Sequence, residues 1–361
     1  MSLYKLKNLW YNNSEISKYK RQTIRLLFRE EKQMPPFIET LSPMLTLFLC
    51  IAIGFTAGKT KILPINASQT IAKLETWIFC PALSFMTMLR YCTVETLFTH
   101  SLNIILAAIC VAVAMAIAIP ISKLLVKNNP SERGVYSYAL AFANSSYFGD
   151  PVVLSLFGGE ALAYYKLFTL PFIIMIYIWG IDVLTPKDKN NSSPLKRLLN
   201  APTVAMLVGI ICGLTGIGAY LPNFVASGLE ALKSCMGPCA MLLAGVTVAR
   251  YNLLQMLKKK KVYIATALRL IFIPAVIIAV LFAAKTLINV MFSLSIGNDV
   301  LFLCFFATAA PLGLNTVVFP EAYGGNSETG ASMTIISHAL GVISIPLMYA
   351  LMTAIFGTPF A

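Results

Sequence analysis

Charged residues are scarce in this chain. Asp, Glu, Lys and Arg make up 12% of its 361 residues, whereas 58% are hydrophobic and the mean hydropathy is +0.76. A globular protein in water carries about 25% charged residues, so this composition excludes a surface that faces mainly water. Most of the outer surface is therefore expected to face lipid.

Residues that build metal and catalytic centres are also few. The eight cysteines lie singly in apolar stretches, and no further Cys or His stands at zinc-ligand spacing from Cys235 and Cys239. The sequence has no His-Glu-x-x-His, no phosphate-binding glycine loop, and no second intramembrane Asp for an aspartyl protease. Neither enzymatic activity nor a cofactor is expected.

Long apolar runs, by contrast, are abundant. A helix needs about 20 apolar residues to cross about 30 Å of hydrocarbon. Ten runs come close to this length, at about Ser42–Ala57, Ala67–Leu89, Leu102–Leu125, Val135–Phe157, Ala161–Ile181, Val204–Tyr220, Phe224–Ala249, Val262–Ala284, Val300–Pro320 and Ala331–Phe356. The sequence thus predicts an all-α polytopic membrane protein with ten transmembrane helices.

Basic residues are unevenly distributed among the linkers between these runs. The linkers after the first, third, fifth and seventh runs hold fourteen Lys and Arg residues, whereas the others hold only Arg90 and Lys285. The protein is expected in the cell (plasma) membrane. Because basic linkers remain in the cytoplasm, both ends of the membrane domain are expected on the outer side of that membrane. Most of the net charge of +13 then reflects orientation and contact with anionic lipid, and it gives no support to nucleic-acid binding.

The N-terminal tail conflicts with this topology. Residues 1–33 hold eight basic residues and would by themselves favour a cytoplasmic N-terminus. The tail can be an interfacial basic helix, or translation can begin at Met34. We favour the second explanation, because it removes the conflict.

The sequence also repeats itself. Gly54, Pro64, Pro81 and Arg90 in the first half correspond to Gly213, Pro222, Pro238 and Arg250 in the second, at offsets of 157 to 160 residues. Five helices per repeat is an odd number, so the halves must have opposite orientations in the bilayer. The predicted division is a basic tail (1–40), a first repeat (41–182), a cytoplasmic linker (183–200) and a second repeat (201–361).

Helix-breaking residues stand in the middle of the fourth and ninth runs. The fourth contains Asn144-Ser-Ser-Tyr-Phe-Gly-Asp-Pro151, and the ninth contains Pro311-Leu-Gly-Leu-Asn315. Proline removes a backbone donor and glycine permits an unwound backbone, so each run is expected to form two half-helices. Such breaks, at corresponding positions of two repeats, predict the substrate site of a transporter.

These segments resemble the auxin efflux carrier family, which includes plant PIN carriers and bacterial malate-type permeases. Residues 144–151 are similar to its Asn-x-Gly-Phe-x-Gly-x-Pro pattern, and the resemblance covers about Leu41 to Phe356. Similar patterns recur in Pro238–Gly245, in Arg269-Leu-x-x-x-Pro274, and in Pro311, Asn315 and Tyr323-Gly-Gly.

The resemblance implies ten helices in two inverted five-helix repeats, with broken helices four and nine crossing. It also implies a homodimer that acts as a secondary transporter of a small organic anion, such as a mono- or dicarboxylate. The movement would be of the elevator type. The coupling ion, proton or sodium, stays open.

The same resemblance places the substrate-binding residues at the crossing of the two broken helices. They are Asn144, Ser145, Gly149, Pro151, Pro311, Gly313 and Asn315. Half-helices beginning near Pro151 and Asn315 would also direct the positive ends of their dipoles at a carboxylate. The two asparagines can instead cap or bridge the broken backbone, and both roles can coexist.

Asp150 and His338 are candidates for ion coupling. The family pattern has an apolar residue where this chain has Asp150, and an intramembrane acid can carry a proton. It can equally cap a helix that begins at Pro151. If Asp150 stays ionised beside the site, it weakens the case for an anionic substrate and favours a proton-coupled or zwitterionic one. His338 can relay a proton, but a bond to a backbone carbonyl is favoured.

Other features have simpler interpretations. Arg269 can attract anions, although extension of its side chain toward the cytoplasmic end is favoured. Lys73 and Glu75 are expected to face a polar interior or interface. Two glycine pairs are expected at close helix contacts, Gly54 with Gly58 and Gly209 with Gly213. Two other functions remain open, a bile-acid-type symporter driven by sodium or protons and a membrane receptor or sensor.

Overall fold

The computed structural model describes residues 35–360, except 65, 186–192, 294–295 and 324–326. The N-terminal tail before residue 35, the middle of the predicted 183–200 linker and Gly324-Gly325 therefore lie outside the described residues. The described part of the chain contains helices, their connections and one isolated β-bridge. The predicted all-α class is confirmed.

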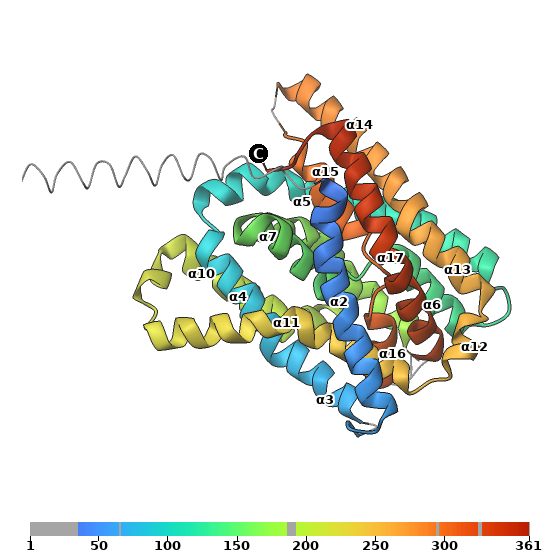
Figure 1. The fold of residues 1–361 in the computed structure, drawn as a ribbon. Helices are drawn as coiled ribbons and strands as arrows, with labels where there is room; N and C mark the ends of the chain where they lie inside the picture. Colours follow the sequence, from blue (N-terminus) through green and yellow to red (C-terminus); the bar gives the residue numbers. More distant parts are fainter. Residues whose placement is uncertain (1–34, 65, 186–192, 294–295, 324–326, 361) are drawn as a thin grey trace, which may run out of the picture.

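The helices of the first half run up to residue 184 (Figure 1). They are α2 (Pro36–Lys59), α3 (Ala67–Leu74), η1 (Glu75–Phe79), α4 (Cys80–Tyr91), α5 (Val94–Leu125), α6 (Pro130–Ala141), η2 (Ser145–Gly149), α7 (Asp150–Met175), η3 (Ile176–Gly180) and α8 (Ile181–Leu184). The wider π-helical turns η1, η2 and η3 are continuous with the helices that follow them.

The second half begins with a short helix and ends with a long one. Its helices are α9 (Pro194–Leu198), α10 (Ala201–Thr215), η5 (Ile217–Tyr220), α11 (Asn223–Ala249), α12 (Leu253–Leu257), α13 (Lys260–Ala267), η6 (Leu268–Phe272), α14 (Ile273–Phe292), α15 (Asp299–Thr308), α16 (Asn315–Tyr323) and α17 (Ser327–Phe356). Here η6 is a π-helical turn that joins α13 to α14.

Six helical segments of the described chain are long and apolar enough to cross a membrane. They are Pro36–Lys59, Val94–Leu125, Ser145–Leu184, Asn223–Ala249, Lys260–Phe292 and Ser327–Phe356. The other predicted spans are shorter, interrupted or more polar, so the number of ten spans stays a prediction.

Helix α2 shows how an apolar helix divides its surface between protein and lipid. Met44, Leu47 and Ile51 are buried, with at most 6% of their surface exposed. Leu45 and Leu49 follow on another face and are 51% and 59% exposed. Because both faces are apolar, one packs in the protein core while the other is suited to contact lipid.

Glycines bring α2 and α11 into backbone contact where the two helices cross (Figure 1). A Cβ atom on Gly54 would lie 2.3 Å from the carbonyl oxygen of Leu242. One on Gly245 would lie 2.1 Å from the carbonyl oxygen of Ile51. Any side chain at either position would separate the two helices.

A second close contact joins α10 to α4. A Cβ atom on Gly209 would lie 2.7 Å from the carbonyl oxygen of Phe85, and one on Gly213 would lie 2.7 Å from that of Met88. The predicted role of these glycines in close helix packing is thus confirmed.

Two helices break in the core, and these breaks position the site. Helix α6 begins at a capped turn, where the Glu132 N–H donates to Asn129 Oδ1 at 3.1 Å, and ends at Ala141. The next helical turn begins at Ser145. Helix α15 ends at Thr308, and α16 begins at Asn315.

A candidate site where two helix breaks meet

The two breaks contact each other through their backbones. Ala143 pairs with Leu312 in an antiparallel β-bridge, and the Asn144 N–H donates to the Pro311 carbonyl at 2.8 Å. All four residues are buried. A break exposes backbone groups that must find partners when they are away from water. Here each break supplies partners to the other.

Side chains satisfy further backbone groups of the second break. The Leu312 N–H donates to Ser337 Oγ on α17 at 3.0 Å. The Gly313 carbonyl accepts the Thr316 hydroxyl at 2.8 Å and the Thr316 N–H at 3.0 Å. Residues 309–314 form no helix, but backbone groups of this break still have hydrogen-bond partners.

Asn144 joins the first break to α17. Its Nδ2 lies 3.4 Å from His338 Nε2, and His338 Nδ1 lies 2.7 Å from the Thr334 carbonyl oxygen. A carbonyl can only accept, so this partner assigns the proton to Nδ1 and leaves Nε2 to accept from Asn144. The favoured interpretation of His338, a bond to a backbone carbonyl, is confirmed.

The second break faces Tyr138 of α6. Asn315 Nδ2 donates to Tyr138 Oη at 3.0 Å. A Cβ atom on Gly313 would lie 3.4 Å from the Phe142 carbonyl oxygen and 3.5 Å from Tyr138 Cε1. Asn315 and Gly313 therefore belong to the crossing, but neither asparagine side chain caps its own helix in the contacts described.

Ser145 also lies at the crossing, while Pro151 points elsewhere. The Ser145 carbonyl accepts a hydrogen bond from Tyr165, as described below. Pro151 instead packs beside Gly237 of α11, whose added Cβ would meet the proline ring at 2.9 Å. The structure thus brings together Asn144, Ser145, Gly149, Pro311, Gly313 and Asn315, and leaves Pro151 at their edge.

The predicted start of a half-helix near Pro151 is wrong. The helix restarts at Ser145, and both Gly149 and Asp150 have helical backbone angles. The wider π-helical turn accommodates a proline that lacks an N–H and would crowd an ordinary preceding turn. Asp150 therefore lies inside a continuous helix, and the interpretation of Asp150 as its cap is also wrong.

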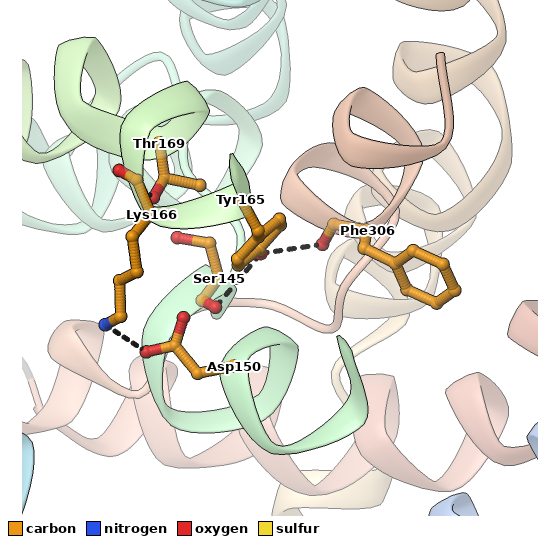
Figure 2. A network of polar contacts seen from close by, with 6 residues as sticks. All are labelled: Ser145, Asp150, Tyr165, Lys166, Thr169 and Phe306. Carbon is orange, nitrogen blue, oxygen red and sulfur yellow. Dashed lines mark hydrogen bonds and ion pairs between the residues drawn. The ribbon is translucent and has the colours of Figure 1, made fainter. Parts of the chain in front are cut away.

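Asp150 instead forms a buried ion pair with Lys166, which sequence reasoning missed (Figure 2). Lys166 Nζ lies 2.5 Å from Asp150 Oδ2, and the two side chains are 3% and 1% exposed. Gly158, with φ at +81°, forms the turn between the two residues in the α7 segment. A lysine within the fifth apolar run was the available signal, but only basic residues in linkers entered the prediction of topology.

Tyr165, the neighbour of Lys166, connects this segment to both broken helices. Its hydroxyl lies 3.0 Å from the Ser145 carbonyl oxygen and 3.2 Å from the Phe306 carbonyl oxygen (Figure 2). Gly149 leaves room for it, because an added Cβ there would lie 2.3 Å from Tyr165 Oη. Tyr165 was not predicted either.

Arg269 of η6 is buried at the end of α6. Its Nη1 donates to the carbonyls of Leu140 at 2.9 Å and Ala141 at 3.4 Å. A guanidinium complements the negative end of a helix dipole and its unpaired carbonyls. The expectation that this side chain extends toward the cytoplasm is wrong, because it is held in the core by the carbonyls that the break in the fourth run leaves without helical partners.

The other edge of the Arg269 guanidinium has no partner among the described residues. Nε and Nη2 are both buried and form no hydrogen bond there. Two such N–H groups on one edge match the two oxygens of a carboxylate. Glu75 on η1 is likewise buried with both carboxylate oxygens unpartnered in the described chain, whereas Lys73 is exposed.

A cavity of about 510 Å³ lies between α5, α6 and α8. Lys123, Arg133 and Asp182 contribute charged groups to its lining. Trp179, also in the lining, packs edge-on against Phe142 with ring centroids 5.9 Å apart. Phe142 is the first residue after α6, so Trp179 connects the lining of the cavity to the break. Within the described residues, no group of three or more His, Cys, Asp or Glu could hold a metal.

Comparison with known proteins gives one family. A family model described as "Membrane transport protein" matches residues 40–193 and again residues 187–349. The two matches follow one another along the chain, as the two predicted repeats do. No curated protein sequence matches the chain.

Proposed function

Because this chain belongs to the membrane transport protein family, that of the auxin efflux carriers, we propose that it is a secondary active carrier of a small organic anion. It is a multi-pass membrane protein. We place the substrate site at the crossing of the two helix breaks and the chain in the plasma membrane. Monocarboxylates and dicarboxylates are the proposed substrate class.

The observation that carries this proposal is a buried set of hydrogen-bond donors at the crossing. Arg269 offers the unpartnered Nε and Nη2, and the helices that begin at Ser145 and Asn315 add the positive ends of their dipoles. Asn144 directly precedes Ser145, and its amide nitrogen lies 3.4 Å from His338 Nε2. Together these groups suit a carboxylate.

Two matching helix contacts support an inverted repeat. At the offset of 157 to 160 residues that relates the two halves of the sequence, α2 corresponds to α10, and α11 corresponds to the run that ends in α4. Exchanging the halves therefore turns the α2–α11 contact into the α10–α4 contact, and both depend on glycines. We propose that residues 41–182 and 201–361 form the two repeats, and that their symmetry permits elevator-type alternating access in a homodimer.

A contact between two helix ends supports the predicted grouping of the basic segments on one side. Lys59 Nζ donates to the Tyr251 carbonyl at 3.1 Å, so the ends of α2 and α11 lie on one side. We assign that side to the cytoplasm and both ends of the membrane domain to the outside. Of the three charged residues that line the cavity, Lys123 and Arg133 are basic and Asp182 is acidic, so the cavity would then attract anions from the cytoplasm.

A binding screen followed by a flux measurement tests this function. The purified full chain is heated with acetate, succinate, L-malate, glutamate or indole-3-acetate. An acid present at about 100 times its Kd stabilises the folded state by about 2.7 kcal/mol, so a true substrate raises Tm.

Counterflow then separates a carrier from a receptor. We expect proteoliposomes preloaded with the stabilising acid to accumulate the labelled acid in a saturable manner. Saturable binding without exchange would instead indicate a receptor. Exchange that requires sodium would favour a sodium symporter of the bile-acid type.

A further inference from the structure

The Asp150–Lys166 ion pair is buried in the core, and neither side chain is among the groups proposed to bind the anion at the crossing. Both residues belong to the apolar segment Ser145–Leu184 and are almost completely buried. Ionisable groups within membrane segments are costly, and apolar side chains often replace a buried ion pair without loss of stability. Its presence therefore calls for a role other than stability.

The pair lies beside the contacts that hold the crossing together. Asp150 directly follows Gly149, whose N–H donates to the Asn144 carbonyl at 3.0 Å. Lys166 directly follows Tyr165, whose hydroxyl contacts the Ser145 carbonyl (Figure 2). A change in the charge of Asp150 or Lys166 therefore occurs one residue away from a residue that makes a hydrogen bond at the proposed substrate site.

We propose that Asp150 is the proton-binding group of a proton–anion symporter and that Lys166 supplies the compensating positive charge. This inference rests on the proposed function. A hydronium ion transfers its proton to a carboxylate oxygen of Asp150, so one O–H bond of hydronium breaks, one O–H bond forms on Asp150 and a water molecule is released, while Lys166 keeps its charge. The pair changes from neutral to a net charge of +1, which offsets one negative charge of the bound acid.

Charge balance explains why this arrangement suits a moving site. The empty site holds the neutral ion pair, and the loaded site holds a proton, the anion and the Lys166 cation. The net charge of the pair and a singly charged anion is zero in both states, and Arg269 adds the same charge to each, so the total charge buried at the site is the same whether it is empty or loaded. Proton and anion each favour binding of the other to the same degree.

Other titratable groups near the pair must be distinguished from it. Cys80 of α4 is within electrostatic reach of both partners, and Tyr165 of α7 is within reach of Asp150. Glu75 of η1 also acts on Cys80 and is the other buried acid in this region. No cation lies in ion-pair contact with Glu75 in the described chain, so its protonation would release no positive charge.

The test uses proteoliposomes containing the full chain and the acid from the panel above that shows the strongest counterflow. Net uptake is driven by an imposed pH gradient with an alkaline interior, and counterflow is measured at equal pH on both sides. We expect the gradient to accelerate net uptake by wild type at least tenfold, with one proton taken up per singly charged acid.

Asp150→Asn mimics the protonated acid permanently. Its empty site would then retain the Lys166 charge and return slowly, while exchange needs no empty return. We expect the ratio of gradient-driven net uptake to counterflow to fall at least tenfold. Glu75→Gln serves as the matched control, and its ratio should stay within twofold of wild type.

The double variant Asp150→Asn/Lys166→Met removes both charges and covers the case in which the single variant fails to fold. A purely structural role predicts normal gradient-driven uptake by this double variant, and that result would overturn the inference. The inference would also be overturned if Asp150→Asn had the same ratio of net uptake to counterflow as wild type. A tenfold fall of that ratio in Glu75→Gln would overturn it as well.

Failure of the inference is distinguishable from failure of the proposed function. If wild type shows counterflow but no response to the pH gradient, only the proton-binding role of Asp150 is wrong. If wild type shows no counterflow with any acid of the panel, the proposed carrier function is wrong and the inference falls with it.

Discussion

Single polar side chains make the broken helices possible in an apolar core. Arg269 pairs with the carbonyls at the end of α6, Ser337 accepts from Leu312 in the second break, and Tyr165 contacts the Phe306 carbonyl near the end of α15. Each side chain comes from a helix other than the one it supports. The site is therefore built by tertiary contacts and cannot form within either broken helix alone.

Arg269→Lys tests the residue proposed to bind the carboxylate. Lysine keeps the positive charge but loses the two-N–H edge, so we expect affinity for the acid to fall about tenfold, or about 1.4 kcal/mol. The measurement is a thermal-shift titration with the acid and with its primary amide. Arg90→Lys, at a half-exposed ion pair with Glu230, is the control and should bind normally. Equal affinity of Arg269→Lys and wild type for the acid would show that Arg269 does not bind the carboxylate.

Lys166→Met tests whether the Lys166 charge compensates the Asp150 charge in the core and so stabilises the fold. Removing one partner of a buried pair leaves an uncompensated charge and typically costs about 3–5 kcal/mol. We expect a marked fall in Tm in detergent at neutral pH. Addition of Asp150→Asn should restore most of it, because no unpaired charge remains. A double variant as unstable as the single one would contradict this account.

Residue patterns predicted part of this site. Gly, Pro and Asn in the fourth and ninth runs were sufficient to place Asn144 and Asn315 at breaks, because helix-breaking residues act locally. Lys166 and Tyr165 were missed because their partners lie 16 residues away or further, across the turn at Gly158. Single-sequence patterns carry no signal for contacts of that kind.

At the scale of elements, close packing decides where helices sit. The backbones of α2 and α11 touch at Gly54 and Gly245, which places an apolar helix against the protein without any bulky side chain between them. A close contact at Gly54 was predictable from its spacing to Gly58, whereas the matching Gly245 on α11 was not predicted. The exact restart of the broken helix was not, since a π-helical turn at Ser145–Gly149 absorbs the effect of Pro151.

Gly245→Ala and Gly228→Ala form a matched pair on α11. The new Cβ at position 245 would lie 2.1 Å from the Ile51 carbonyl oxygen, whereas nothing lies within 4 Å at position 228. Overpacking at Gly245 should cost about 1–3 kcal/mol. Gly228→Ala should be neutral or stabilise the protein by up to about 1 kcal/mol. Thermal unfolding in one detergent compares them, and equal Tm values would contradict backbone contact.

On the scale of the whole molecule, the proposed orientation rests on the distribution of basic residues, and the proposed architecture rests on the internal repeat. Lys259 and Glu328 form an ion pair at 2.8 Å, which places the linker before α13 and the start of α17 on one side, as the predicted topology requires. The composition was sufficient for the helical membrane class. The division into ten spans depends on helices such as α15 that are too short to identify by hydropathy alone.

Two introduced cysteines test the orientation. Ser131 lies in the first turn of α6, at an end assigned to the cytoplasm, and Ala219 lies in η5, at the end of the sixth run that is assigned to the outside; both are exposed. A membrane-impermeant maleimide should label Ala219→Cys in intact cells and Ser131→Cys only after permeabilisation. Unmodified protein, whose eight cysteines are free, is the background control. The reverse labelling pattern would invert the topology.

The most direct test of the central claim is counterflow of the labelled acid by wild type, Asn144→Ala and Asn315→Ala at equal density in proteoliposomes. A hydrogen bond to a charged ligand is worth about 1.5–3 kcal/mol, so each variant should lose at least about tenfold in exchange while folding normally. Saturable exchange by wild type and its loss in both variants is the predicted result. Near-normal exchange in both variants would contradict a substrate site at the crossing of the two broken helices.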